Sequence, residues 1–260
     1  MENQIIDTHV HLYDVTDPHD ALGKSFEAGV TDVIVLGVDL ASNIKHLEFR
    51  GKTDPRVHLA FGLHPGNITS VADTAACLQF MREHVHGSVA IGEAGLDFWY
   101  KWVRQDDAKK QAQREAFRAQ IDLAAEFDLP IVIHARGTWR ECLDTAKAAG
   151  IKKADFHWYS GPVDVLQGIL DAGYLVSVSP ALEYSPDSRR TAEYVPLDRL
   201  LIETDTPVKV SLPDGTRVPS TPRDVWRTLK ALCAVKKIAE DLALPVLNAN
   251  ARAFFNLDML

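Results

Sequence analysis

Short apolar runs rich in β-branched residues alternate along this chain with longer stretches whose apolar residues follow a helical period. A run of this kind, bounded by turn residues, is typical of a buried β-strand. The pattern predicts eight strands, at Gln4–His9, Asp32–Leu36, Val57–Phe61, Val89–Glu93, Ile131–His134, Ala154–His157, Tyr174–Val178 and Leu200–Asp205.

The stretches between these strands have the periodicity of amphipathic helices. In Asp106–Phe127, the residues Phe117, Ile121, Ala124 and Ala125 follow one another at i, i+4, i+7 and i+8, so they share one face. Strands that alternate with helices form parallel sheets, because each helix carries the chain back to the start of the next strand. Eight such units predict an α/β fold, a (β/α)₈ TIM barrel that occupies residues 1–260 as a single domain.

Glycine and proline support this division of the chain. Asp17-Pro18 and Thr221-Pro222 each place a capping oxygen before a proline that suits a first helical turn. Gly150 and Gly173 stand where helices are expected to end. The stretch Pro207–Ser220 has no period, and we expect it to be an irregular active-site loop after the last strand.

The composition fits one large core in a reducing compartment. The chain has 260 residues, 46% of them hydrophobic, and its three cysteines are widely spaced without a CxxC pair. There is no apolar run of about 18 residues and no basic-then-apolar leader, so we expect a cytoplasmic protein without a membrane partner. The formal charge of −8 argues against a protein that grips nucleic acid through many phosphates, so such a substrate would be held locally.

Candidate chemistry stands at the ends of five predicted strands, whose carboxyl ends meet at one mouth of a barrel. A single histidine there is more often a hydrogen-bonded structural residue than a ligand, but several converging side chains favour a metal centre. Four imidazoles and two carboxylates exceed a closed one-zinc site and suit two divalent ions that share a carboxylate. Without a thiolate, the set would accept zinc, manganese or magnesium. The six residues are His9, His11, Glu93, His134, His157 and Asp205.

Seven short motifs surround these residues and span nearly the whole chain. They are His9-Val-His11, Phe61-Gly-Leu-His64-Pro65, Gly92-Glu93-Ala-Gly95-Leu96-Asp97, Gln113-Arg-Glu-Ala-Phe117, Leu129-Pro-Ile-Val-Ile-His134-Ala-Arg136, Phe156-His157-Trp-Tyr-Ser160-Gly161 and Glu203-Thr-Asp205-Thr-Pro207. In their order and spacing they resemble the signatures of the TatD-related deoxyribonucleases. The resemblance implies a TIM-barrel hydrolase that cleaves phosphodiester bonds, as an exodeoxyribonuclease does, with water activated by two divalent metal ions.

The resemblance also implies a division of the ligands. It assigns His9 and His11 to one ion, His134 and His157 to the other, and Glu93 to a bridge between them. Asp205 would complete the first site and act as the general base that takes a proton from the attacking water.

Residues around the mouth are the implied substrate contacts. His64, Arg136 and Ser160 would orient the substrate phosphate or support the metal ligands, and a surface salt bridge is a further alternative for Arg136. Trp99, within the aromatic run 98–102, would stack on an unpaired base, and packing under the next helix is its alternative. Glu203 is expected to support the ligands rather than to bind metal, because its side chain alternates with that of its neighbour. The expected partner is the end of a single DNA strand.

The residues are also compatible with two other functions. One is a small-molecule ester, lactone or amide hydrolase of the wider amidohydrolase group, and the other is a TatD-like nuclease of an antiphage defence system. A bridging lysine, common in amidohydrolases, has no candidate here, since the first lysine after Glu93 is Lys101. The chain departs from the family pattern at positions that flank the mouth, namely Ala94, Ala135, Gly137, Ser220 and Thr221.

Overall fold

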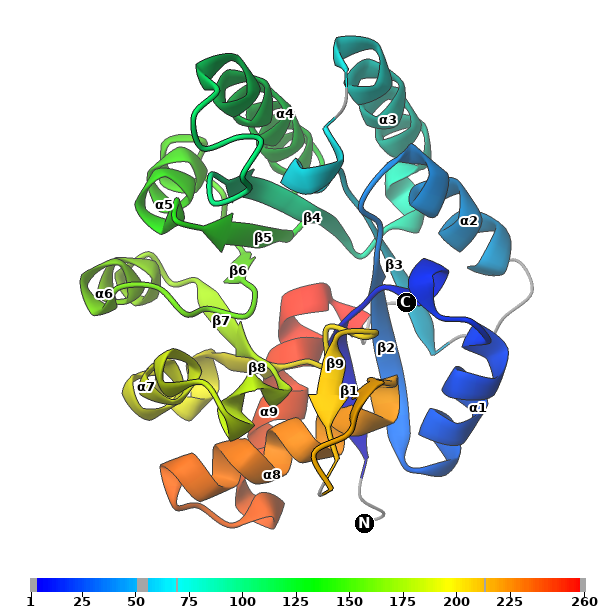
Figure 1. The fold of residues 1–260 in the computed structure, drawn as a ribbon, viewed down its shortest axis with the longest axis vertical. Coiled ribbons are helices and arrows are strands. Elements are labelled where there is room, and N and C mark those ends of the chain that lie inside the picture. Colours follow the sequence, from blue (N-terminus) through cyan, green and yellow to red (C-terminus); the bar gives the residue numbers. More distant parts are fainter. Residues whose placement is uncertain (1–3, 51–55, 69, 213, 258–260) are drawn as a thin grey trace.

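The eight predicted strands form one closed parallel sheet in a computed structural model that describes residues 4–50, 56–68, 70–212 and 214–257. Each strand pairs with the next in chain order, and a parallel bridge between Val10 and Thr206 closes the ring. Figure 1 shows the strands at the centre with the helices around them, so the predicted TIM barrel is confirmed. The strands are β1 (Ile5–Val10), β2 (Val30–Leu36), β3 (Val57–Phe61), β4 (Ala90–Asp97), β5 (Ile131–Arg136), β6 (Ala154–Phe156), β7 (Leu175–Val178) and β8 (Leu200–Ile202).

The fourth strand is longer than the sequence pattern predicts. We expected Glu93 to end it, but β4 continues to Asp97, with an irregular register against β5 between Ile91 and Ala94. The sequence pattern did not predict this continuation, because the residues Ala94–Asp97 do not alternate between apolar and polar side chains. Conversely, β6 and β8 end before His157 and Asp205, which lie on the loops that follow.

Nine helices connect or cover the strands in the part of the chain that the structure describes. The predicted capping oxygen of Asp17 accepts a hydrogen bond from the backbone N–H of Asp20, and Asp106 caps the long helix through Lys109. Thr221 caps a short 3-10 helix, Pro222–Asp224, that leads into α8. The helices are α1 (Pro18–Glu27), α2 (Leu40–Arg50), α3 (Val71–His84), α4 (Asp107–Glu126), α5 (Trp139–Ala148), α6 (Val163–Asp171), α7 (Pro186–Tyr194), α8 (Val225–Lys236) and α9 (Glu240–Phe255).

Alternate residues of the strands enter two different hydrophobic clusters. On β2, Val33 and Val35 pack towards the surrounding helices, while Ile34 and Leu36 belong to an inner cluster with Phe254 and Phe255 of α9. The Lys153 ammonium group, just before β6, donates to carbonyls at the end of α9, which places that helix end near the amino-terminal ends of the strands. The carboxyl ends of the strands lie at the opposite end of the barrel, where a functional site can form.

The predicted loop at Pro207–Ser220 contains a β-hairpin. β9 (Lys209–Ser211) and β10 (Arg217–Pro219) pair antiparallel, with Val210 buried between its exposed neighbours. Three-residue strands are too short for alternation to be recognised among prolines, which is why the sequence pattern missed them. All three cysteines are buried and free. None of the helices in the described part of the chain has the length and apolar content of a membrane span.

Candidate metal centre

The six expected ligands come together at the carboxyl ends of the strands, around a cavity of about 670 Å³. The side chains of His11, Glu93, His134, His157 and Asp205 line this cavity, and His9 lies fully buried behind it. Residues from β1, β4, β5 and the loops after β6 and β8 therefore share one small volume, as the sequence pattern predicts.

The first group surrounds one oxygen of Glu93. The Nε2 atoms of His9 and His11 lie 3.1 Å apart, and they lie 3.4 and 3.2 Å from Glu93 Oε2. Asp205 Oδ1 completes the group at 3.7 Å from His9 Nε2 and 3.3 Å from His11 Nε2. Two imidazole nitrogens and two carboxylate oxygens thus converge on one point, which suits a divalent cation.

The second group surrounds the other oxygen of the same carboxylate. Glu93 Oε1 lies 2.9 Å from His134 Nδ1 and 2.9 Å from His157 Nε2, and these two nitrogens are 3.4 Å apart. His64 Nε2 is also near, at 3.6 Å from Oε1. Glu93 therefore presents one oxygen to each pair of histidines.

Hydrogen bonds on the outer side of two rings place the lone pair of the neutral imidazole on the nitrogen that faces Glu93. His11 Nδ1 donates to the carbonyl oxygen of Leu36 at 3.0 Å, so its lone pair is on Nε2. His134 donates through Nε2 to Asp97 Oδ2 at 3.1 Å, which leaves the lone pair on Nδ1. Orienting partners of this kind are the usual support of metal-binding imidazoles.

Glu203 has the corresponding position behind His157 and His9. Its Oε1 lies 3.4 Å from His157 Nδ1, and its Oε2 lies 3.8 Å from His9 Nδ1 and accepts from Ser177 Oγ at 2.6 Å. Glu203 is fully buried, away from the cavity lining, and its atoms face the outer nitrogens of both rings. This geometry suits the supporting role that we expected for it.

His64 differs from the other rings. Its Nδ1 accepts the backbone N–H of Gly66 at 3.0 Å, and burial lowers the pKa of the imidazole to about 3, so the ring is neutral. A neutral ring that accepts at Nδ1 carries its hydrogen on Nε2. The nitrogen that faces Glu93 and the cavity is thus a donor, suited to a phosphate oxygen rather than to a metal ion.

The pKa shifts of the ligand side chains indicate that the site favours positive charge. Burial alone would lower the pKa of His11, but hydrogen bonds to Asp205 and Glu93 outweigh it and raise the pKa to about 10. Burial alone would raise the pKa of Glu93, but the neighbouring imidazoles, His157 foremost, hold it well below its usual range. The pKa of Asp205 is lowered in the same way by the hydrogen bond from His11. A divalent cation would displace the protons from these imidazoles, and two ionised carboxylates among neutral imidazoles are a donor set that fits such a cation.

Asp97 is a site residue that we did not expect. It is fully buried at the end of β4, accepts from His134 Nε2, and also accepts from Arg136 Nε at 2.8 Å. The sequence held a signal for it, since Asp97 closes the motif that contains Glu93 four residues earlier. Tyr13 and Trp158 also line the cavity without having been expected there.

Two of the other expected substrate contacts lie in the cavity, and the third, Trp99, does not. Arg136 and Ser160 line the cavity, and the Arg136 guanidinium lies 5.0 Å above the Tyr100 ring while it forms the ion pair with Asp97. The salt bridge that we weighed for Arg136 is present, but its partner is the buried Asp97 and its side chain is 44% exposed.

Trp99 does not line this cavity. Its indole is 60% exposed and meets Trp139 edge to face, with the ring centroids 5.9 Å apart. A Cβ at Gly137 would lie 2.3 Å from Trp99 Nε1, so glycine at this position makes room for the indole. The aromatic run divides, because Tyr100 stacks on Trp102 at 4.3 Å while Phe98 packs against the core.

The parallel barrel and its buried cluster of histidines and carboxylates define the class of the protein, a metal-dependent hydrolase. Within that class the chain belongs to the TatD-related DNase family, whose family model, TatD related DNase, matches residues 6–256.

Relatives cover the chain from end to end. A Mycobacterium tuberculosis protein named "Uncharacterized metal-dependent hydrolase TatD" is 31% identical over 97% of this chain and 98% of the relative. A Danio rerio protein named "Putative deoxyribonuclease tatdn3" is 29% identical over 98% of each chain. The crystal structure of YjjV, a TatD homologue from Escherichia coli, matches with a TM-score of 0.86 at 26% identity, over 98% of this chain and 99% of that one.

Proposed function

We propose that this protein is a two-metal phosphodiesterase that removes nucleotides from the ends of single-stranded DNA. The observation that carries the proposal is the division of Glu93, whose two oxygens face two separate pairs of imidazoles. A carboxylate in this position suits a bridge between two cations, and two adjacent cations are a common arrangement for phosphodiester hydrolysis.

Each half of the centre would hold one ion. His9, His11 and Asp205 would bind the first with Glu93 Oε2, and His134 and His157 would bind the second with Glu93 Oε1. The donor set accepts zinc, manganese or magnesium. When bound, the two ions would supply positive charge that stabilises the pentavalent transition state at phosphorus and favours ionisation of the attacking water.

Asp205 is the proposed general base. Its carboxylate lines the cavity, and its backbone N–H donates to the carbonyl oxygen of His9 at 3.0 Å, which fixes the loop that carries it. Because neighbouring imidazoles lower its pKa, the carboxyl group is ionised at neutral pH and able to accept a proton from water.

Three side chains would orient the phosphate. The Nε2–H of His64, the guanidinium of Arg136 and the hydroxyl of Ser160 all reach the same cavity, and all can donate to phosphate oxygens. Trp99, whose exposed indole lies against Gly137, the residue after Arg136, would stack on the base next to the scissile bond.

One observation supports DNA as the substrate, and another supports its single-stranded form. The Danio rerio relative is named a putative deoxyribonuclease. A net formal charge of −8 disfavours binding to the two backbones of a duplex, whereas a single end needs only local contacts.

A substrate panel tests the proposal. Protein stripped of metal and reloaded with manganese would be assayed on a labelled single-stranded DNA, the same sequence as RNA and as blunt duplex, a carboxylic ester and a lactone. We expect the fastest turnover on single-stranded DNA, and loss of it in the Asp205→Asn variant. Turnover of the ester or lactone without any phosphodiester cleavage would instead assign the protein to small-molecule hydrolysis.

A further inference from the structure

A second cavity, of about 990 Å³, lies next to the β9–β10 hairpin. Its walls are the hairpin, the end of the 3-10 helix Pro180–Glu183 and the outer face of α8, which passes beside β9 in Figure 1. We call this cavity the hairpin groove and define it by the lining residues Tyr184, Ser211, Leu212, Arg217, Arg227 and Lys230.

The hairpin groove carries more positive than negative charge. Arg227 is held by the carboxylate of Glu183, with Nε to Oε1 at 2.9 Å, and also donates to the carbonyl of Ser211. Arg217 donates to the carbonyl of Lys209, and neither Arg217 nor Lys230 has an acidic partner among the residues that the structure describes. Two cations are thus left uncompensated on a protein whose formal charge is −8.

Apolar surface lies beside these cations. Tyr184 is 57% exposed and Leu212 is 38% exposed, so the groove offers an aromatic ring and an aliphatic side chain to a ligand. Cations that alternate with an exposed aromatic ring are the usual way in which proteins hold a single nucleic-acid strand without reading its sequence.

β9 leads from the lining of the metal centre to the lining of the hairpin groove. Pro207 and Val208 line the cavity of the metal centre, and Ser211, at the far end of β9, lines the hairpin groove. Extended chain rises about 3.3 Å per residue, so Val208 and Ser211 are separated by about 10 Å along the hairpin. A single DNA strand whose end lies at the metal centre could therefore extend along the hairpin.

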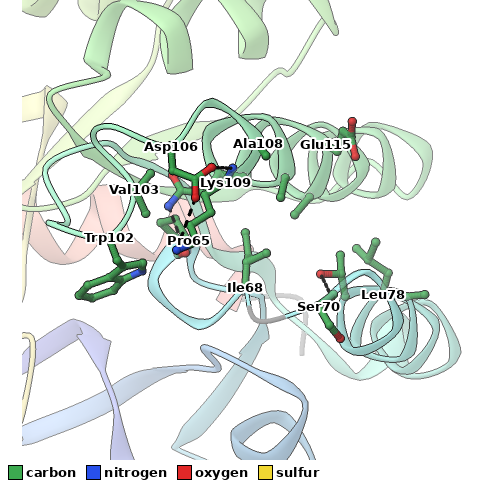
Figure 2. Close-up of a pocket in the computed structure, with 15 residues that line it drawn as sticks. Pro65, Ile68, Ser70, Leu78, Trp102, Val103, Asp106, Ala108, Lys109 and Glu115 are labelled. Carbon is green, nitrogen blue, oxygen red and sulfur yellow. Dashed lines mark hydrogen bonds and ion pairs between the residues drawn. The ribbon is translucent and has the colours of Figure 1, made fainter.

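The groove between α3 and α4 has different chemistry (Figure 2). That cavity, of about 560 Å³, is lined mainly by apolar residues such as Ile68 and Leu78. Its lining charges are Asp106, Lys109 and Glu115, and Lys109 lies 3.6 Å from Asp106. Its net charge is negative, so it does not suit a phosphate backbone.

We propose that the hairpin groove binds the sugar-phosphate backbone of a single DNA strand whose end is being hydrolysed. Arg217 and Lys230 would each contact a phosphate, and the Tyr184 ring would stack on a base. This inference rests on the proposed function, because it places the rest of the strand whose end occupies the metal centre. It predicts that affinity grows with strand length beyond the nucleotides at the metal centre.

The test uses metal-loaded protein with Asp205→Asn, which slows cleavage during a binding measurement. Fluorescence anisotropy would give the Kd for a labelled 12-nucleotide single strand over a range of salt concentrations. Each phosphate contact adds about 0.7 to the slope of log Kd against log salt for a single strand. Arg217→Ala with Lys230→Ala should therefore lower the slope by about 1.4, which is a relative change in Kd of about 25-fold for each tenfold change in salt.

Two further variants separate groove contacts from general charge and from folding. Lys45→Ala with Lys147→Ala removes the same charge from exposed positions on α2 and α5, and it should keep the original slope. Arg217→Lys with Lys230→Arg keeps both cations and should also retain it. Loss of slope only in the alanine pair at the groove supports the inference.

The opposite results overturn it in distinguishable ways. If the strand binds and is cleaved, but the groove alanine pair has the same slope as the Lys45 and Lys147 pair, the groove does not hold the strand and the proposed function stands. If the unsubstituted protein neither binds nor cleaves single-stranded DNA, the proposed function fails and the groove inference fails with it.

Discussion

The Oδ2 atom of Asp97 lies 3.1 Å from Nε2 of His134, on the side of the ring opposite to Glu93. The carboxylate accepts the ring N–H and so fixes the lone pair of His134 on the nitrogen that faces the metal centre. Arg136 anchors the same oxygen of Asp97, so one buried carboxylate positions both a proposed ligand and a proposed phosphate contact.

Asp97→Asn is therefore expected to weaken metal binding. Loss of an orienting partner typically costs 10- to 100-fold in metal affinity, and we expect a loss of about that size for the second ion. Isothermal titration with Mn²⁺ measures it. Asp122→Asn, which removes an exposed partner of Arg118 on α4, is the matched control and should leave both affinities unchanged. Equal affinities in the two variants would contradict the positioning role of Asp97.

Asp205→Asn should reduce turnover far more than metal content. The amide oxygen can still coordinate, but an amide does not accept a proton at neutral pH. General-base assistance is typically worth about 10²–10⁴-fold in rate, so a loss of at least this size is expected. Turnover and metal content by elemental analysis would be measured on the same preparation.

Glu93→Gln is the informative comparison for Asp205→Asn. A neutral amide is a poor bridge between two cations, so this variant should lose metal at both positions as well as activity. If Asp205→Asn kept near-normal turnover with both ions bound, Asp205 would not be the base.

Trp99→Ala should raise KM for single-stranded DNA about tenfold, since stacking is worth roughly 1–3 kcal/mol per base. The kcat should change little, and hydrolysis of a small diester without a neighbouring base should be unaffected. Trp102→Ala removes a similarly exposed indole that lines the groove between α3 and α4, and serves as the control. Identical KM values for the two variants would remove Trp99 from the substrate site.

The sequence allowed the barrel and the convergence of its polar residues to be predicted for one physical reason. Buried strands of a parallel barrel are nearly uniformly apolar, so a histidine such as His134 at the end of Pro130–His134 stands out from its surroundings. Because all strands run in the same direction, residues at their carboxyl ends must meet. The positions of His134 and His157 at the ends of two strands were therefore sufficient to predict that they meet.

The remaining features depend on contacts that no local pattern records. The protonation of His64 follows from the backbone N–H of Gly66, and the position of Trp99 follows from the missing side chain at Gly137. The role of Asp97 follows from the continuation of β4 past Glu93, through small residues that have no strand-like alternation. Each of these relationships depends on tertiary contacts, so the sequence could identify the residues but not the partners that they contact.

The central claim is that two metal ions bridged by Glu93 perform the hydrolysis, and a metal titration with paired rate measurements tests it most directly. Metal-free protein would receive Mn²⁺ in steps of a fraction of an equivalent, and cleavage of single-stranded DNA would be measured at each step. The account predicts no cleavage without metal and a rate that rises until two equivalents per chain are bound. Full cleavage in chelator-treated protein, or a rate complete at one equivalent, would contradict it.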